Sequence, residues 1–542
     1  MSAVNVIHDE NDSTHSNEKN YDGARGKGNE SGPEQVTNSN AVESSPSVSR
    51  WISFRTDILL MPLLTIAFGM QYYDKAILGS ATLFGILTDL NLIDPDGKTY
   101  RYSQASACFY YGYLAGAIPM SILAQRWKGQ LHIFLGVMVI LWGIIVMLTC
   151  IVTDYRGLYA QRIFLGFVEA SVSPGFVAIT RMWYTKAEQP LRLGIWWSAV
   201  GLFSIVSGLI NNALGRADTA LADWKLMFLV PGAFTIFFGF LLLIFLPPSP
   251  LRSPLIPIPG FNKFSQEQRE AIDTKVRRNM TGNERAGSSW NWEQAKEGLR
   301  DPQIYIFFLL ATAIYVSNGA VTVFGPLLVK SIGFTSLRAT ILLTPGGATT
   351  AVGIYTVAFL ATRKWVYRIP FARTALLIIS CWPVIIGCAM CWRGNWEHKA
   401  IPLAGYYLIP IFGAPFVMML GSCTANIAGS TKQAIASAAI FLGYNCGNIA
   451  SSYILISKEK KDHYPTTFQI VIGCMCATMA LATIQALYLA NENRKRDRLY
   501  GRSVNSTNTS DEKEAQLKAA QLEETFNHDL TDRQNTNFRY TY

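Results

Sequence analysis

Hydrophobic residues fill long blocks of this chain, and shorter polar segments separate the blocks. Each block approaches the roughly 20 residues that an α-helix needs to cross the hydrocarbon core of a bilayer. About twelve blocks satisfy this criterion. They lie at 58–80, 103–124, 131–152, 157–181, 191–214, 225–246, 303–328, 337–361, 371–392, 401–422, 433–456 and 467–490. The pattern predicts an all-α membrane protein with twelve transmembrane helices.

Polar segments divide these blocks into two sets of six. Residues 1–50 are rich in Asn, Ser, Glu and Gly and predict a disordered cytoplasmic tail without an apolar signal-peptide core. The first bundle is predicted at 51–247, and a proline-rich sequence then opens a central loop at 248–302. The second bundle follows at 303–491, and a charged tail at 492–542. Two six-helix halves joined by a polar loop are typical of the major facilitator fold.

Lysine and arginine in the short loops predict the orientation of the chain in the membrane. The basic connections Gln125–Gln130, Thr185–Arg192 and Thr362–Arg373 fall on the same side as the central loop. That side is therefore predicted to be cytoplasmic, with both termini on it. The bias is modest, because the basic loop Ser457–His463 lies on the opposite side. The net charge of +10 suits a surface that faces anionic lipid, and no nucleic-acid partner is expected.

The remaining composition argues against catalytic chemistry. Only 15% of the residues are charged, whereas soluble proteins contain about 25%. The nine cysteines lie almost entirely within predicted crossings and are interpreted as small packing residues. Cys388 and Cys391 form a CxxC without further ligands nearby, so no metal site and no cofactor are expected. The glycine-rich Thr344–Gly353 indicates close helix packing. Because no nucleophile–base arrangement or nucleotide motif is visible, an enzyme and an ATP-driven pump are both disfavoured.

The most informative segment is RIFLGFVEASVSPGF, Arg162–Phe176, which places two opposite charges inside an apolar block. An ionised side chain at the bilayer centre costs at least about 2.5–3.5 kcal/mol, so it usually faces a partner or a substrate path. Arg162 and Glu169 are seven residues apart and share one helix face. Burial favours the neutral form of a carboxyl, so Glu169 is a candidate proton carrier. The alternative is a fixed Arg–Glu bridge between helices.

A second charged pair, Asp74 and Lys75, lies in the first block. Their side chains point about 100° apart on a helix, so each is expected to meet a different neighbour. Lys75 is predicted at a depth similar to that of Arg162, and two cations on adjoining helices would attract a carboxylate. Asp74 would hold a neighbouring cation in place and assist proton coupling. The alternative is a helix-end pair in which Lys75 extends outward to the membrane surface.

Further polar side chains inside the blocks are candidates for substrate binding. Tyrosines at these positions would line a cavity or pack against other helices. Asparagines would bind substrate or bridge helices, because polar groups in lipid need partners. The candidates are Gln71, Tyr72, Tyr113, Asn318 and Asn445.

Several motifs together resemble the anion:cation symporter branch of the major facilitator superfamily, and in particular the fungal allantoate-permease-like transporters. They are YYDKAILGSA in the first block, RIFLGFVEASVSPGF in the fourth, ADWKLMFLVPG in the sixth, NIAGSTKQA from Asn426 and DLTDRQNTNFRYTY from Asp529. Two positions depart from the family pattern. Lys225 stands where the family has Arg, and Gln125 where the superfamily expects Asp.

The resemblance implies proton-coupled import of a small organic anion across the plasma membrane by alternating access. Related carriers take allantoate, ureidosuccinate, short peptides, vitamin carboxylates or sulfur compounds. Carried over by position, Lys75 and Arg162 would contact the anion, and Glu169 would couple the proton. The protein is expected to function as a monomer in the bilayer without a cofactor. The alternative is a nutrient sensor that keeps the transporter fold and signals through its tails.

Overall fold

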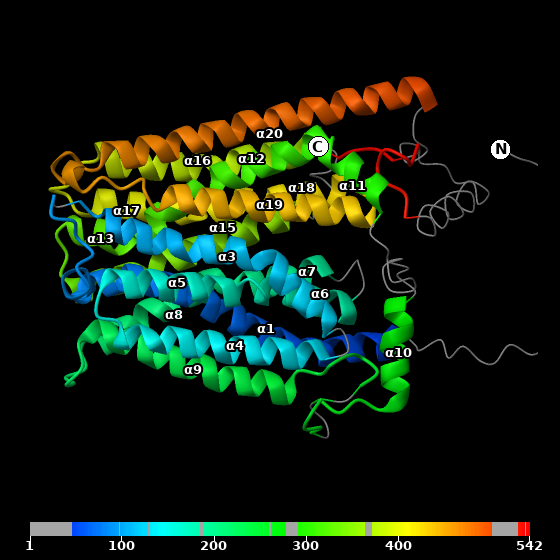
Figure 1. Ribbon diagram of the computed structural model, residues 1–542. Helices are drawn as coiled ribbons and strands as arrows, with labels where there is room; N and C mark the ends of the chain where they lie inside the picture. Colours follow the sequence, from blue (N-terminus) through cyan, green and yellow to red (C-terminus); the bar gives the residue numbers. More distant parts are fainter. Residues whose placement is uncertain are drawn as a thin grey trace, which may run out of the picture.

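The computed structural model describes residues 46–500 and 529–541, apart from 97, 128–129, 185–188, 253, 259–261, 278–290, 362, 364–370 and 537. The disordered tail predicted at 1–50 falls almost entirely outside these residues. Long helices lie side by side along one common direction (Figure 1). In the first half they are α1 (Pro46–Ala81), α3 (Tyr100–Arg126), α4 (Leu131–Leu148), α5 (Tyr155–Glu169), α6 (Val172–Trp183), α7 (Gln189–Trp197), α8 (Ala199–Leu214) and α9 (Asp223–Phe245).

The second half repeats this arrangement after two short helices of the central segment, α10 (Gln266–Arg277) and α11 (Trp292–Leu299). Its elements are α12 (Pro302–Val316), the π-helix η4 (Gly319–Val323), α13 (Gly325–Ser331), α14 (Ser336–Leu342), α15 (Thr344–Ala361), α16 (Ala372–Arg393), α17 (Ala400–Leu408), α18 (Gly413–Asn426), α19 (Ser430–Ser451) and α20 (Pro465–Tyr500). α10, α11 and the C-terminal segment lie at one end of the bundle, which we call the predicted cytoplasmic end (Figure 1, right). The opposite end is called the outer end.

Among the described residues, eleven helical spans are long and apolar enough to cross a membrane. The count of twelve from the sequence differs by one, and the difference is α19. This helix of 22 residues runs alongside the others, but it contains Lys432, Asn445 and Asn448, all buried. It packs along α12 and also contacts α3, so its polar side chains face other helices instead of lipid. A helix covered by protein does not need the hydropathy of a lipid-facing one.

The fourth crossing is interrupted where α5 ends at Glu169 and α6 begins at Val172. Pro174 has no N–H to donate to the carbonyl of Ala170, so a regular helix cannot continue through this point. Regular α-helical bonding resumes at the next residue, where the Gly175 N–H donates to the Ser171 carbonyl at 3.2 Å. The sequence motif thus breaks the helix directly after its buried carboxylate.

Within each half the helices pack in pairs, with α4 along α9, α3 along α5, α12 along α19 and α16 along α20. The halves meet where α8 packs on α15 and α3 on α19. The result is the two-bundle arrangement predicted from the sequence, with the interface between the bundles running along the helix axes.

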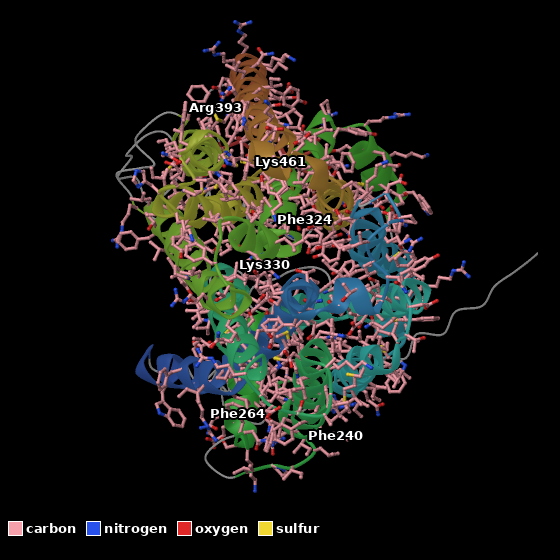
Figure 2. All side chains as sticks on the ribbon, turned by 90° about the vertical axis from the view of Figure 1, so that its left-hand side faces the viewer. Phe240, Phe264, Phe324, Lys330, Arg393 and Lys461 are labelled. Carbon is pink, nitrogen blue, oxygen red and sulfur yellow. The ribbon has the colours of Figure 1, made fainter. Side chains whose placement is uncertain are left out.

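Hydrogen bonds join the two halves at the outer end. The Tyr102 hydroxyl donates to the Val323 carbonyl at 2.5 Å, and its ring packs edge-on against Phe324 at 5.8 Å. In the view onto this end, Phe324 lies near the middle of the molecule (Figure 2). The Asn212 amide donates to the Leu337 carbonyl at 2.6 Å. Further hydrogen bonds across this interface join Ser452 to Ser106 and Tyr453 to Gln104. The outer end is therefore closed by contacts between the halves.

Glycines allow the closest approach of the halves. A Cβ on Gly347 of α15 would lie 2.5 Å from the carbonyl oxygen of Gly201 on α8 and 2.8 Å from the Ser204 Cβ. A backbone carbonyl cannot rotate away from an added Cβ, whereas the end of a flexible side chain can. Small residues at such crossings let helices pack in a membrane where no hydrophobic effect drives them together.

We therefore expect Gly347→Ala to destabilise the protein by about 1–3 kcal/mol, as overpacking of a tight contact does. Thermal unfolding of the detergent-purified protein measures the effect. Gly421→Ala on α18 is the matched control, because a Cβ there meets nothing within 4 Å. Equal melting temperatures for the two variants would contradict the close-packing role of Gly347.

Candidate functional site

The charged residues predicted from the sequence come together between α1 and α5. The Lys75 Nζ lies 3.5 Å from the Glu169 Oε2. The Glu169 side chain is fully buried, whereas 15% of the Lys75 side chain is exposed. Lys75 thus turns toward the carboxylate on α5, and its extension to the membrane surface is not observed. The ionic partner of Glu169 is Lys75, and the Arg–Glu bridge that was the alternative from the sequence is not observed for this carboxylate among the described residues.

Arg162 is buried and only partly satisfied. Its Nη1 donates to the backbone carbonyl of Asp74 at 3.5 Å, and its guanidinium lies 5.7 Å from the centre of the Phe228 ring. Its Nε and Nη2 have no hydrogen-bond partner. Buried donors without partners are costly, and the planar guanidinium matches the two oxygens of a carboxylate. Arg162 therefore offers unused donors to an anionic group.

Asp74 completes the group of four charges. It is 1% exposed, and neither of its carboxylate oxygens accepts a hydrogen bond of regular geometry, although the Trp142 indole N–H lies close enough to interact with the carboxylate. The charges of Glu169, Arg162 and Lys75 all act on it. We call Asp74, Lys75, Arg162 and Glu169 the charge cluster. Its two cations balance its two carboxylates, so one added proton or one added anion changes its net charge.

Gln71 and Ser173 fix the point at which α5 breaks. The Gln71 amide donates to the Glu169 carbonyl at 3.4 Å, and the Ser173 hydroxyl donates to the Gln71 Oε1 at 3.2 Å. Gln71 therefore connects α1 to the end of α5 and the start of α6. The sequence-predicted binding residue lies beside the charge cluster, with its amide bonded to the protein.

Tyrosines surround Lys75 and extend toward the second half. The Lys75 Nζ lies 5.1 Å from the centre of the Phe109 ring and 5.8 Å from that of Tyr113. A cation over aromatic faces is stabilised by their quadrupoles. Tyr72 is partly exposed, and its hydroxyl is near Ser204 and Thr322, so it reaches across the interface between the halves.

An aromatic wall from the second half faces the charge cluster. Tyr315 on α12 and Tyr444 on α19 have ring centres 4.3 Å apart, and Tyr444 lies 6.3 Å from Tyr110 of the first half. Tyr315 also packs on Phe416 at 4.7 Å. The charge of Glu169 acts on Tyr444. Sequence reasoning missed these rings. The only signal was the position of Tyr444 next to Asn445, in a block with unusually many polar residues.

The asparagines connect α12 to α19. The Asn318 amide donates to the Asn448 Oδ1 at 2.7 Å, and the Thr322 hydroxyl donates to the Asn318 Oδ1 at 2.6 Å. Asn318 is thus placed as a bridge between helices. The Asn445 amide donates to the Phe441 carbonyl at 2.8 Å, while its Oδ1 is buried without a partner.

The cysteines pack among the helices. Cys391 donates to the Pro402 carbonyl at 3.2 Å, and Cys388 is fully buried. Over the part of the chain that the structure describes, no three His, Cys, Asp or Glu side chains are grouped as metal ligands.

Comparison with known proteins identifies the family. A family model described as Major Facilitator Superfamily matches residues 58–452. The chain belongs to the major facilitator superfamily. This family consists of transporters, so the protein is a membrane transporter and not an enzyme.

Relatives and solved structures agree with this assignment. An uncharacterized transporter of Schizosaccharomyces pombe is 30% identical over 497 residues, which cover 91% of this chain and 88% of the relative. The allantoate permease of Saccharomyces cerevisiae is 26% identical over 508 residues, covering 92% and 88%. A bacterial homologue of the human lysosomal transporter Spinster shares the fold with a TM-score of 0.57 at 15% identity, covering 80% of this chain and 96% of that one. The resemblance to allantoate-permease-like transporters and the predicted fold class are confirmed.

We expect Asn318→Ala to lower the stability of the transporter by about 0.6–1.7 kcal/mol, the range measured for hydrogen bonds between membrane helices. The loss of one bridge should leave the Michaelis constant for substrate nearly unchanged. Thermal unfolding and concentration-dependent uptake measure the two effects separately. A raised Michaelis constant at unaltered stability would assign Asn318 to the substrate instead.

Proposed function

We propose that this transporter is a proton-coupled symporter that imports a small organic anion by alternating access between its two halves. The supporting observation is the charge cluster, which keeps the buried Arg162 and the partly buried Lys75 between helices, with two Arg162 donors unfilled. Buried ionisable residues in membrane helices usually mark a path for substrate or protons. The aromatic wall across the interface gives the substrate a second surface.

The anion is proposed to bind where Lys75 and Arg162 converge. The Lys75 ammonium lies 3.5 Å from the Glu169 carboxylate, so a substrate carboxylate must compete with Glu169 for it. Arg162 can bind the same anion through the Nε and Nη2 that have no partner in the structure. Charge-assisted bonds of this kind are roughly twice as strong as neutral ones.

Protonation of Glu169 supplies the coupling in this proposal. A neutral Glu169 releases Lys75 from its ion pair, and the freed ammonium then attracts the anion. With both carboxylates ionised the cluster is neutral, and it is neutral again when one proton and one monoanion have bound. Either partner alone leaves an unbalanced charge in a low-dielectric site, which is costly. The empty and the doubly loaded states are therefore the ones suited to change conformation.

The buried carboxylate of Asp74 narrows the proposed substrate class. Its two oxygens accept no hydrogen bond of regular geometry, so they can accept bonds from a substrate that carries N–H groups as well as a carboxylate. Allantoate has this combination and is a monoanion, and a relative of this chain is named an allantoate permease. We propose plasma-membrane localisation with both termini cytoplasmic and a functional monomer.

Replacement of Arg162 by Ala is expected to reduce uptake by roughly two orders of magnitude, because truncating one member of a buried charge group costs about 2–5 kcal/mol. Labelled-substrate uptake in cells measures the loss, with surface labelling to confirm membrane delivery. Arg156→Ala is the control, since Arg156 lies on the same helix but is exposed. Wild-type uptake by the Arg162 variant would refute its role in the site.

Glu169→Gln is expected to keep substrate exchange while losing accumulation driven by a pH gradient, because Gln imitates the neutral acid permanently. Proteoliposomes measure both activities, as counterflow of labelled substrate and as uptake against an imposed gradient. Glu397→Gln, at an exposed outer position, should leave both unchanged. Accumulation by the Glu169 variant with the normal pH dependence would rule out this carboxyl as the coupling group.

The substrate itself can be identified by expressing the chain in permease-deleted yeast on single nitrogen, sulfur or vitamin sources. Growth that depends on the chain, with matching labelled uptake, would name the substrate. Signalling by a transport-dead variant in response to the same compound would instead favour the nutrient sensor.

A further inference from the structure

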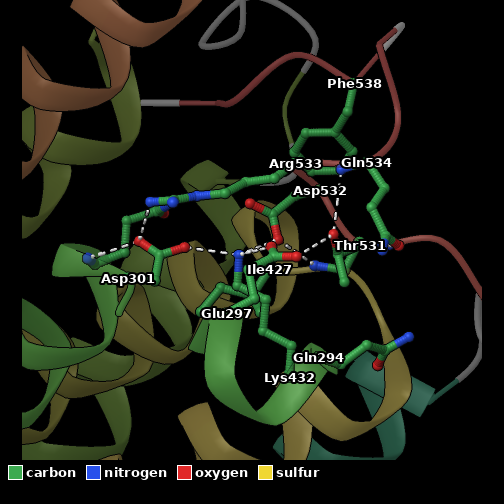
Figure 3. A network of polar contacts seen from close by, with 12 residues as sticks. Gln294, Glu297, Asp301, Ile427, Lys432, Thr531, Asp532, Arg533, Gln534 and Phe538 are labelled. Atoms are coloured by element: carbon green, nitrogen blue, oxygen red, sulfur yellow. Dashed lines mark hydrogen bonds and ion pairs between the residues drawn. The ribbon is translucent and has the colours of Figure 1, made fainter. Parts of the chain in front are cut away.

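The segment from Asp529 to Thr541 lies against the predicted cytoplasmic end of the second half (Figures 1 and 3). Although the segment carries several polar side chains, Thr531 and Asp532 are fully buried and Tyr540 is 4% exposed. A polar chain segment buried to this degree must have its hydrogen bonds met by the surface that receives it. The structure shows such a surface in detail.

Lys432, in the first turn of α19, is the centre of the contact (Figure 3). Its Nζ lies 2.6 Å from the Asp301 Oδ2, 2.7 Å from the Asp532 Oδ1 and 2.9 Å from the Glu297 Oε1. The Lys432 side chain is completely buried. The three carboxylates come from α11, from the residue before α12 and from the C-terminal segment. A buried ammonium is tolerated only when it is paired, so this lysine holds the three elements at one point.

Asp301 and Arg533 extend the ionic contact to the start of α12. The Asp301 Oδ1 accepts the Gln303 N–H at 3.1 Å and thereby caps α12. The Arg533 Nη2 lies 3.5 Å from the same oxygen. Asp301 serves both as helix cap and as ion-pair partner, so the segment contacts the start of the helix that carries Tyr315.

Tyr540 connects the segment to α20. Its hydroxyl donates to the Asp532 Oδ2 at 2.7 Å and lies 3.2 Å from the Arg496 Nη2, which donates to it. Burial raises the pKa of the Tyr540 phenol, and the Asp532 carboxylate adds to the effect, so the hydroxyl remains a donor. The Asn493 side chain bonds both backbone groups of Tyr540, at 2.8 Å and 2.9 Å.

The connection between α18 and α19 is held in the same way. The Asn426 side chain donates to the Thr541 carbonyl at 2.8 Å and accepts the Thr541 N–H at 2.7 Å. The Asp529 carboxylate accepts from the Ser430 N–H at 3.0 Å and from its hydroxyl at 2.5 Å. These backbone-directed bonds recognise the segment residue by residue, as a peptide-binding site does.

We propose that Asp529–Thr541 is an intramolecular clasp, bound in a site of its own, that holds the cytoplasmic ends of α11, α12, α18, α19 and α20 together so that the second half moves as one body. Of the elements joined by the contacts above, α12, α18, α19 and α20 belong to this half, and α11 is the part of the central segment that leads into it. The clasp therefore stabilises the helices of one bundle and does not fix the two bundles relative to each other. It is independent of substrate identity and of proton coupling, because neither the clasp nor its receiving surface includes the charge cluster.

The clasp affects transport through the wall that faces the charge cluster. α19 carries both Lys432 and Tyr444, and α12 carries Tyr315 near the end opposite its Asp301 cap. Release of the clasp frees the ends of these helices, so the aromatic wall is less well positioned. Transport then slows because the second half no longer moves rigidly.

Deletion of residues 529–542 tests the proposal. We expect the truncated transporter to melt several degrees lower and to show a several-fold lower maximum uptake rate with little change in the Michaelis constant. A synthetic peptide of residues 529–542, added to the purified truncated protein, should raise the melting temperature saturably. A scrambled peptide should not. A truncated protein with wild-type melting temperature or maximum rate would overturn the clasp, and so would absence of any peptide effect.

Variants of the peptide distinguish specific docking from general stabilisation. The substitutions are made in the peptide, so the truncated transporter is the same in every measurement. A peptide with D532N should bind at least severalfold more weakly, because it leaves Lys432 with one carboxylate fewer. A peptide with T536A is the matched control, since Thr536 is exposed and uses only its backbone carbonyl. If the two variant peptides raised the melting temperature of the truncated protein equally and at the same concentrations, the ionic site would be refuted. Failure of the symport proposal would leave these binding results unaffected.

Discussion

A charged side chain inside the bilayer must have either a partner or a ligand, and this requirement determines how the helices of the first half are placed. Glu169 is enclosed at the end of α5, and its only ion-pair partner among the described residues is Lys75 from α1. Arg162 is held by one backbone carbonyl and an aromatic face while two of its donors remain unused. A site in this condition is stable enough to fold but gains further from an incoming anion. Because the charge cluster is buried and its charges are balanced, a proton bound at Glu169 leaves a net positive charge in the site.

The second half meets the charge cluster with aromatic rings instead of opposite charges. Tyr315 packs edge-on against both Tyr444 and Phe416, and hydrogen bonds between the halves close the outer end. Rings can slide and separate without leaving a bare charge behind, whereas an ion pair across the interface would resist separation. This division of chemistry suits two bundles that must move relative to each other. At the predicted cytoplasmic end the ionic contacts instead remain within one bundle, around Lys432.

The sequence predicted much of the fold because hydropathy and loop charge are local properties. Most helical spans begin and end within several residues of the predicted blocks, although α20 continues to Tyr500, ten residues beyond its block, and the break after Glu169 follows from Pro174. α19 shows the limit of hydropathy, since a helix covered by its neighbours can keep buried Lys and Asn residues.

The site was predicted in part. Spacing placed Arg162 and Glu169 on one helix face, but the ion-pair partner of Glu169 is on α1, and helical periodicity cannot reveal a contact between helices. The aromatic wall depends on packing between halves, and the role of the C-terminal motif depends on contacts with residues more than 90 positions away, such as Lys432 and Asp301.

Binding of the anion at the charge cluster is tested most directly by an experimental structure of the transporter with its identified substrate bound. The account predicts that the anionic group of the substrate lies within hydrogen-bonding distance of Lys75 or Arg162, with the Lys75–Glu169 ion pair broken. A substrate bound elsewhere, with that pair intact and Arg162 still enclosed by protein, would contradict it.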